Sequence, residues 1–551
     1  MSGARGAPQG ADGGGGVAFL DLSRMGDSDN LARGISDLAA VGDDGGGVVT
    51  AVRTLAGRLK LIHWEIDSTG VRRLGDSGDQ AREATNLAMA KHAKHVVAYR
   101  TGAGTLKLIS WDVASDGPIT RSGDSGSQAD AVTVIRMVAL GDGTFVVACR
   151  GASGNLKLIT WQLNTDGSLT RLADGGSAPP EAVSEIALID VSTAGGRVLT
   201  AVRASSGHLK LITWRVTASG AITRLVDSGD QAGEASLIRA VRTSVGQVVT
   251  SVRDGNGNLK LISWLLPADD SAINLQGDSN GQAGEIGDNA LLALEDGVVS
   301  AVRTGSGELK LISWAVGRTG SIVRRGDSGH QAGKATLIHL QPGTQAVDLA
   351  GRSVTMITPV RTASGTLKLI TWGPTCVRVH IKILTTPNVN IGTMVASMRA
   401  VYDAAGITVN RLTTETLNLP LLTDVDIGEC VAGETTAEQD QLFANRNDVG
   451  PNDVVVYFVR STIPATNGCA VHPDGRPGAV VTQTATRWTM AHEIGHVLGL
   501  PHCDTGGQCE LDRLMTGCGT ANITNPPPDL IAAEVGTMQG SSLTVGCLGI
   551  P

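Results

Sequence analysis

The chain has 551 residues, too many for one ordinary domain, so we expect two or more hydrophobic cores. Its 72 glycines and its aromatic content of only 3% are typical of short strands joined by tight turns. From residue 376 onward there are 17 acidic and 9 basic residues, whereas the first 375 residues balance at 36 of each. Neither part has the basic excess of a nucleic-acid-binding protein, so we expect no nucleic-acid partner.

The N-terminus is rich in glycine, and residues 1–16 are predicted to be flexible. They lack the apolar segment of a secretory signal peptide, and no run of the chain is apolar enough to span a membrane. Residues 17–22 are predicted to form a short strand, which comes shortly before a Gly-Asp-Ser triplet at 26–28.

A sequence repeat dominates residues 17–373. Its most regular block, Leu-Lys-Leu-Ile-x-Trp, occurs seven times and ends at Trp64, Trp111, Trp161, Trp214, Trp264, Trp314 and Trp372. Repeats of about 40–50 residues that contain several short strands are typical of β-propellers. The last spacing is the longest, and we expect an inserted loop between Gly343 and Arg352.

Each repeat offers four candidate strands, as a propeller blade requires. In the fifth copy the expected strands are 235–241, 247–253, 259–264 and 271–275. A Gly-Asp-Ser triplet or a close variant is expected after the fourth strand, with its aspartate at Asp27, Asp76, Asp124, Asp174, Asp227, Asp278 and Asp327.

The two ends of the repeat array are complementary. The array begins with a lone fourth strand at 17–22, and its last copy ends at Trp372 with three strands. The N-terminal strand can therefore complete the last blade, which would close a ring of seven and remove open sheet edges. The sequence thus predicts an all-β seven-bladed propeller over residues 17–373.

The recurrent charged residues have two interpretations. Identical blades need the same residues in order to pack identically, so the favoured interpretation of the repeated Lys, Asp and Arg positions is structural. The Arg positions are Arg53, Arg100, Arg150, Arg203, Arg253, Arg303 and Arg361. The alternative is a set of sugar or peptide sites between blades. Cys149 lies within an apolar run and is predicted to be a small buried thiol.

Residues 376–551 mix helical and strand patterns and are predicted to form an α+β domain. Strands are expected at 377–383, 407–411 and 454–460, and helices at 394–405 and 489–498. A last helix is expected to begin with Asp529 as its N-cap and to reach Met538.

The segment 492–502 reads His-Glu-Ile-Gly-His-Val-Leu-Gly-Leu-Pro-His. On a helix, His492 and His496 project from one face, so both imidazoles can bind one zinc ion. Gly499 permits a sharp turn that returns His502 as a third ligand. Three protein ligands leave a fourth position open, as in catalytic zinc sites, and Glu493 is placed to act on a water there.

A second element, Asp512-Arg513-Leu514-Met515-Thr516-Gly517, follows the third histidine. With the eleven-residue motif it resembles the metzincin zinc proteases, first the pappalysin-type branch and second the matrixins. The resemblance implies that His492, His496 and His502 are the zinc ligands, that Glu493 is the general base and that Met515 is the Met-turn methionine. Some metzincins carry a tyrosine two residues after that methionine, where this chain has Gly517.

The resemblance also implies a substrate-binding edge strand before the active-site helix. The residues assigned to it are Gly468, Cys469, Ala470, Val471 and His472. An extended peptide would pair with this edge as an added strand. His380 and His472 are not expected to be ligands.

The cysteines are concentrated in the second part of the chain. Seven of the eight lie between Cys376 and Cys547, and their pairing is left open by the sequence. Cys503 follows the third histidine directly, and we expect it to form a disulfide that pins this loop. So many cysteines indicate an oxidising, extracellular destination.

The predicted function is therefore that of a secreted zinc endopeptidase with a propeller for targeting or substrate docking. Zinc would activate a water and polarise the scissile carbonyl, and Glu493 would move the proton. One catalytic zinc is expected, with calcium as a further candidate cofactor without assigned ligands. Expected partners are a protein or peptide substrate and a glycan or protein ligand of the propeller, on a monomer. The alternatives are a propeller lectin or adhesin with a secondary or latent protease domain, and an exported toxin-like protease.

Overall fold

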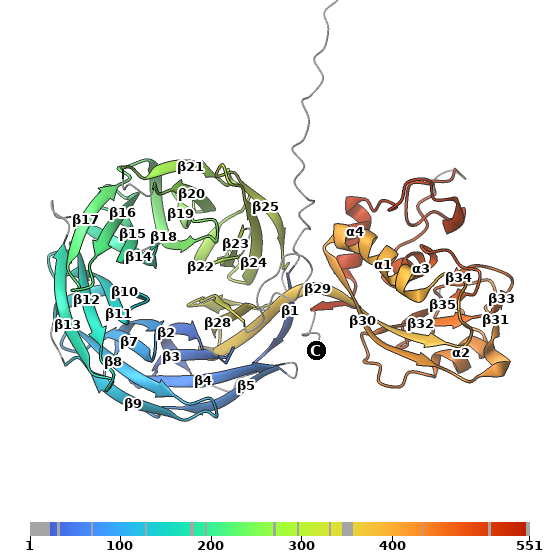
Figure 1. The fold of residues 1–551 in the computed structure, drawn as a ribbon, viewed down its shortest axis with the longest axis horizontal. Helices are drawn as coiled ribbons and strands as arrows, with labels where there is room; N and C mark the ends of the chain where they lie inside the picture. Colours follow the sequence, from blue (N-terminus) through green and yellow to red (C-terminus); the bar gives the residue numbers. More distant parts are fainter. Residues whose placement is uncertain are drawn as a thin grey trace, which may run out of the picture. The chain divides into compact units, whose positions relative to one another are not determined.

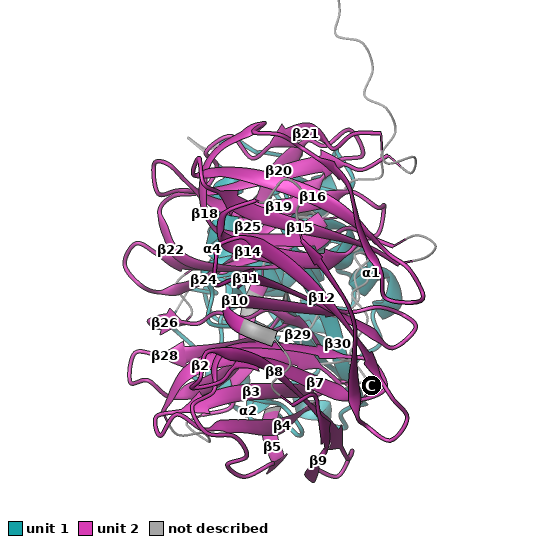
Figure 2. Ribbon diagram, turned by 90° about the vertical axis from the view of Figure 1, so that its left-hand side faces the viewer, with its two compact units in different colours: residues 1–20, 375–545 teal, residues 21–374, 546–551 magenta. Residues whose placement is uncertain are grey.

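The computed structural model describes residues 22–29, 34–43, 45–67, 70–126, 129–176, 181–192, 196–267, 271–294, 297–329, 332–343, 356–431, 433–504 and 508–546. The chain divides into two compact units, coloured separately in Figure 2. We call residues 22–374 the repeat unit and residues 375–545 the C-terminal unit.

The repeat unit is built from short antiparallel strands that follow one another in sets of four. The first three sets are β2 (Ile35–Gly42), β3 (Val48–Thr54), β4 (Leu59–Asp67) and β5 (Gly70–Asp76); β6 (Thr85–Lys91), β7 (His95–Arg100), β8 (Thr105–Val113) and β9 (Ile119–Asp124); β10 (Ala129–Ala139), β11 (Thr144–Gly151), β12 (Leu156–Leu163) and β13 (Leu169–Gly176). The next three are β14 (Val183–Asp190), β15 (Gly196–Ala204), β16 (His208–Val216) and β17 (Ile222–Asp227); β18 (Ala232–Arg242), β19 (Val248–Asp254), β20 (Leu259–Leu265) and β21 (Asn274–Asp278); β22 (Ile286–Ala293), β23 (Gly297–Thr304), β24 (Leu309–Val316) and β25 (Ile322–Asp327).

The seventh set joins the two ends of the array. It contains β26 (Ala335–Thr336), β27 (Gln341–Pro342), β28 (Met356–Thr362), the first part of β29 (Leu367–Ile383) and the N-terminal strand β1 (Leu22–Asp27). β1 pairs antiparallel with β29, for example at Arg24 and Trp372. The blades follow one another around a ring (Figure 1), so the repeat unit is a β-propeller whose first described strand completes the last blade.

Two details of the repeat differ from the predictions, and a third concerns residues that the structure does not describe. The fourth strand of the fifth blade begins at Asn274 and ends at Asp278, so the Gly-Asp pair lies inside the strand rather than after it. A bulge between Ser263 and Trp264 lets the pairing continue to Asp278. The first strand of the seventh blade is split into β26 and β27. Residues 17–21 and most of the expected insertion at 343–352 lie outside the described residues.

The repeated tryptophans form the core of each blade. All seven are at most 1% exposed, and five donate their indole N–H to a hydroxyl fourteen residues earlier, as Trp64 does to Thr50 at 2.9 Å. In the second and third blades that earlier position is Val97 or Val147. The indole nitrogens of Trp111 and Trp161 have no hydrogen-bond partner among the described residues.

The recurrent charged residues bind one another within the blades. The lysine of the Leu-Lys-Leu-Ile block pairs with the Gly-Asp aspartate, as Lys260 does with Asp278 at 2.7 Å. The serine after that aspartate accepts a hydrogen bond from the repeat backbone, as Ser279 Oγ does from Leu261 N at 3.0 Å. These contacts favour the structural interpretation of the Lys and Asp positions.

Three of the repeated arginines reach the next blade. Arg150 Nε donates to Val183 O at 2.8 Å, and Arg253 Nε donates to Ile286 O at 3.0 Å. Arg361 Nε donates to Ile35 O at 2.7 Å and so links the last blade to the first. Cys149 is fully buried in β11, as predicted, and burial raises the pKa of its thiol to about 12.

The C-terminal unit contains a mixed sheet. Its strands are the second part of β29, β30 (Ile407–Thr416), β32 (Val454–Val459), β35 (Gly478–Thr482) and β34 (Gly468–Cys469). β30, β29, β32 and β35 pair in parallel in that order, and β34 pairs antiparallel with β35 at the edge. Two short strands, β31 (Asp424–Asp426) and β33 (Ser461–Ile463), pair separately, and β36 (Thr544–Gly546) lies near the C-terminus.

Helices lie on both sides of this sheet (Figure 1). They are α1 (Ile391–Tyr402), α2 (Ala437–Phe443), α3 (Thr489–Val497) and α4 (Ala532–Gly540), with 3₁₀ turns at Asp403–Ala405, Pro420–Leu422 and Thr520–Asn522. Val379 and Ile381 of β29 pack into one core with α1 and α3, whereas Phe443 of α2 packs against Tyr457 in the core of the other face. Strand alternation produces these two faces.

Two helix starts differ from the predictions. α1 begins three residues before the expected Met394, because the side chain of Asn390 accepts a hydrogen bond from Gly392 N at 2.7 Å and caps the helix there. Asp529 is not the N-cap of α4, which begins at Ala532. The backbone of Asp529 instead pairs with the Met515-containing segment through Asp512 O and Leu514 N. Among the described residues, no helix is long and apolar enough to cross a membrane.

Candidate metal centre

Helix α3 carries three of the motif residues. His492 and His496 lie one turn apart on the same helix face, and Glu493 lies next to the first of them. The helix ends before Gly499, whose φ of +101° is a conformation that favours glycine. Leu500 N then donates to Gly495 O at 3.0 Å, and the turned chain brings His502 back to the helix.

The three imidazoles converge on one point. His496 Nε2 lies 3.1 Å from His492 Nε2 and 3.1 Å from His502 Nε2. The three ligand atoms all lie within 4.8 Å of one another, and this is the one such group of three or more His, Cys, Asp or Glu residues found across the described ranges. Tetrahedral zinc with Zn–N bonds of about 2.0–2.1 Å would separate its ligand nitrogens by roughly 3.3 Å.

The outer ring nitrogens show why a cation fits here. His492 Nδ1 lies 2.7 Å from Leu514 O, and His496 Nδ1 lies 2.6 Å from Leu500 O. A carbonyl accepts only, so each Nδ1 carries the proton, and in the neutral ring Nε2 presents a lone pair. Burial lowers the pKa of His492 to about 4, which keeps that ring neutral. Lone pairs that face one another at 3.1 Å repel, and a metal ion between them would remove the repulsion.

Glu493 is held against the edge of the sheet. Its residue exposure is 7%, and burial raises the pKa of its carboxyl group to about 8. A Cβ atom built on Gly468 of β34 would lie 2.5 Å from Glu493 Oε1. The Glu493 carboxyl group therefore lies against the backbone of the edge strand.

Met515 lies against helix α3. It is fully buried, and its Sδ would lie 2.7 Å from a Cβ on Gly495, the residue between the two helical histidines. Its carbonyl accepts a hydrogen bond from Cys503 N at 2.9 Å. Glycine at 495 thus leaves the space that the methionine side chain fills.

Asp504 connects the third histidine to the Met515 turn. Its carboxylate accepts hydrogen bonds from Gly517 N at 2.6 Å and from Thr516 Oγ1 at 3.3 Å. A Cβ on Gly517 would lie 2.6 Å from Asp504 Oδ2 and 3.2 Å from His502 Cγ. The Asp504 carboxylate and the His502 ring therefore fill the space that a side chain at position 517 would need.

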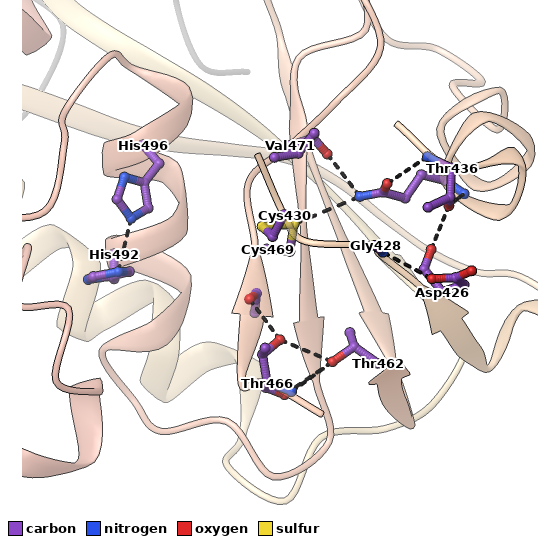
Figure 3. The surroundings of a disulfide bond; sticks show 12 residues. Asp426, Gly428, Cys430, Thr436, Thr462, Thr466, Cys469, Val471, His492 and His496 are labelled. Atoms are coloured by element: carbon purple, nitrogen blue, oxygen red, sulfur yellow. Dashed lines mark hydrogen bonds between the residues drawn. A yellow bond between two sulfur atoms is a disulfide. The ribbon is translucent and has the colours of Figure 1, made fainter. Parts of the chain in front are cut away.

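The predicted substrate strand is shorter than expected. Only Gly468 and Cys469 pair as β34, while Ala470, Val471 and His472 follow in an irregular segment. A disulfide joins Cys469, the last residue of β34, to Cys430 (Figure 3). The Gln439 amide of α2 also donates to Val471 O at 3.4 Å. These contacts fasten the segment to the α2 side of the unit.

The disulfide expected at Cys503 is not formed. Cys503 is a free thiol, whereas Cys509 and Cys518 are joined and Cys376 is also disulfide-bonded. The Cys503 side chain packs partly against the main core of the unit. The disulfides are consistent with a non-reducing environment.

Sequence reasoning missed Asp504, Gln439 and the proximity of Gly468 to Glu493. Asp504 lies two residues after the third histidine, so its position offered a signal. The contacts of Gln439 with Val471 and of Gly468 with Glu493 each span more than twenty residues of the chain. His380 lies outside the cluster and contacts Thr413 and Asp453 at 2.7 and 3.1 Å.

No protein-family model matches the chain, and no curated protein matches it. Among solved structures, the chain is similar to the crystal structure of Saccharomyces cerevisiae Sqt1, with 12% sequence identity and a TM-score of 0.40. The match covers 64% of this chain and 99% of that chain.

Proposed function

We propose that the C-terminal unit is a zinc-dependent endopeptidase of the metzincin type. The observation that supports this most directly is the convergence of His492, His496 and His502, together with a buried Glu493 at the residue after the first of them. When bound, zinc would supply a Lewis acid for the scissile carbonyl and a water of lowered pKa. No covalent intermediate with the protein is needed.

The residues of the chain have separate tasks in this proposal. The three histidines hold the ion, and the carbonyls of Leu514 and Leu500 fix the ring orientation of two of them. Burial favours the protonated form of Glu493, whereas the charge of a bound metal ion would favour the ionised form. The ionised Glu493 carboxylate then accepts the proton of the attacking water and passes it to the leaving amine. Gly517 carries no side chain, so a tyrosine hydroxyl contributes nothing to the transition state from that turn.

The edge strand would hold the substrate. β34 is the last strand of its sheet, so its outer side offers backbone N–H and C=O groups to an extended peptide. The carboxylate of Glu493 lies against Gly468 of that strand. A peptide paired along this edge would therefore pass close to the general base.

The test compares the wild-type chain with Glu493→Ala and with Glu429→Ala, a control at an exposed glutamate of the same unit. Zinc content is measured for each, and cleavage of a proteome-derived peptide library is read by mass spectrometry. We expect one zinc per chain in all three and cleavage by the wild type and Glu429→Ala only. Full cleavage by Glu493→Ala, or folded wild-type protein without zinc, would refute the proposal.

We further propose that the propeller binds a glycan or protein ligand and so brings the protease to its substrate. A hollow of about 500 Å³ in the first blade supports this, since ligand pockets usually measure about 300–1,000 Å³. Its lining combines the exposed Leu55 with the charged Lys60, Arg73 and Asp79. Ligand capture by Glu493→Ala on glycan and peptide arrays, lost in Leu55→Asp, would support a docking site. Capture that Leu55→Asp leaves unchanged would exclude this hollow.

A further inference from the structure

Gly468 lies unusually close to Glu493. A Cβ at position 468 would lie 2.5 Å from Glu493 Oε1 and 2.7 Å from both Cγ and Cδ. Ordinary van der Waals contacts of a Cβ begin at about 3.4 Å. Even alanine would therefore overlap the whole outer part of the glutamate side chain.

Backbone conformation does not explain this glycine. Twenty-five glycines of the described residues have positive φ, and Gly468 is not among them. Its backbone pairs with Val481 as an ordinary antiparallel strand, a conformation open to every residue with a free N–H. What glycine supplies at 468 is space, and Glu493 occupies that space.

Neither partner in this contact can retreat easily. Gly468 is held by its pairing with Val481, by the hydrogen bond from Thr466 Oγ1 to its carbonyl at 3.0 Å, and by the disulfide at the next residue, Cys469 (Figure 3). Glu493 is 7% exposed in a helix whose neighbouring residue His492 is also buried. An added methyl group would have to displace the carboxylate.

We propose that Gly468 is a positioning residue that seats the Glu493 carboxylate at the metal centre. The inference rests on the proposed protease function. The Glu493 side chain packs against the backbone of the edge strand. The strand that would bind the substrate peptide would therefore also orient the general base. Preorganisation of this kind matters because a misplacement of about 1 Å can reduce a rate roughly 100-fold.

The proposal predicts a specific kinetic effect. In Gly468→Ala the histidine ligands are untouched, so the zinc content should remain one per chain. The turnover number kcat should fall on the order of 100-fold. KM should change little, because the backbone groups of the edge remain in place. Gly536→Ala is the matched control, since a Cβ at that glycine of α4 meets no atom within 4 Å.

A thermal-unfolding cycle tests the contact without relying on activity. Gly468→Ala should lower the Tm of the full chain through overlap with the Glu493 side chain, and it should lower the Tm little in a Glu493→Ala background. If Gly468→Ala fails to fold alone but folds with Glu493→Ala, the contact is supported in the same way.

The outcomes separate this inference from the proposed function. Retained zinc, reduced kcat and a Tm loss that depends on Glu493 support the inference. Unchanged kcat in Gly468→Ala, or an equal Tm loss in both backgrounds, would overturn it. If the wild type binds zinc but cleaves no peptide, the protease proposal fails, and the Tm cycle alone decides whether Gly468 seats Glu493.

Discussion

Asp504 accepts a hydrogen bond from the backbone N–H of Gly517 at 2.6 Å, which ties the loop of the third histidine to the turn that carries Met515. The same carboxylate accepts hydrogen bonds from Thr516 Oγ1 and from Glu510 N. The loop that follows helix α3 and the turn that carries Met515 are thereby held as one support for His502. The site therefore depends on a residue that is not itself in the ligand group.

We expect Asp504→Ala to weaken zinc binding about 10- to 100-fold, the usual cost of losing a residue that orients a metal ligand. Competition with a chelator of known affinity measures this effect. Asp504→Asn should lose less zinc affinity, because its amide oxygen can still accept a hydrogen bond from Gly517 N. Asp512→Asn is the control, since that side chain is exposed in the same segment. Equal zinc affinity in Asp504→Ala and wild type would contradict the proposed support.

Gly495→Ala should destabilise the C-terminal unit even though alanine is the better helix former. An exposed helix gains about 1 kcal/mol from this change. Here the new Cβ would lie 2.7 Å from the Sδ of the buried Met515, and overpacking of a core costs about 1–3 kcal/mol. Urea unfolding measures the net loss. The control Gly536→Ala in α4 should be neutral or stabilising, and a loss of the same size there would remove the packing explanation.

The two propeller tryptophans without a hydrogen bond suggest a stabilising substitution. Val97→Thr and Val147→Thr place a hydroxyl where five other blades have one, so each should stabilise the propeller by about 1 kcal/mol. The reverse change, Thr50→Val, leaves the buried Trp64 N–H unpaired and should cost about 1–3 kcal/mol. Thermal unfolding measures both directions. A lower Tm in both Val→Thr variants would show that the indoles are satisfied by another route.

Asp453 should make the stability of the C-terminal unit depend on pH. Burial alone raises the pKa of its carboxyl group, but hydrogen bonds from His380 and Gly450 N and the charge of Arg378 lower it below the usual value. A carboxylate with a lowered folded-state pKa stabilises above its unfolded pKa of about 3.9, and this stabilisation is lost as the pH falls through the folded value.

Asp453→Asn tests this dependence. The variant should be less stable than wild type at pH 7. The difference should shrink as the pH falls from about 4, near the unfolded pKa, through the lower pKa of the folded state. Urea unfolding between pH 3 and 7 measures it. A difference that stays constant over this range would mean that Asp453 acts through packing rather than through its charge.

The sequence allowed the local features to be predicted and missed those that depend on distant pairing. The repeated Trp and Asp positions predicted the blades, because one period of the chain contains all the strands of one blade. The i, i+4 spacing predicted that His492 and His496 share a helix face. The place of Gly468 against Glu493 depends on how β34 pairs with β35, which no local pattern encodes.

The cysteines show the same limit. Spacing along the chain cannot distinguish Cys503, which turns toward a core, from Cys509 and Cys518, which face each other. Similarly, Asp529 is of a residue type that often caps helices, but its backbone is hydrogen-bonded to the segment before Met515. In both cases a long-range contact overrides a correct local preference.

The disulfide between Cys430 and Cys469 gives the last prediction. It closes a separation of 39 residues and fixes the edge strand next to Gly468, so its removal in Cys430→Ser/Cys469→Ser should cost about 2–4 kcal/mol. The loosened edge should also raise KM for peptides, because an ordered strand is needed for pairing with the substrate. Unfolding and peptide kinetics measure the two effects. Cys503→Ser is the control: its thiol is free, so both quantities should stay near wild type, and a change as large as that of the double variant would assign the effect to thiol loss in general.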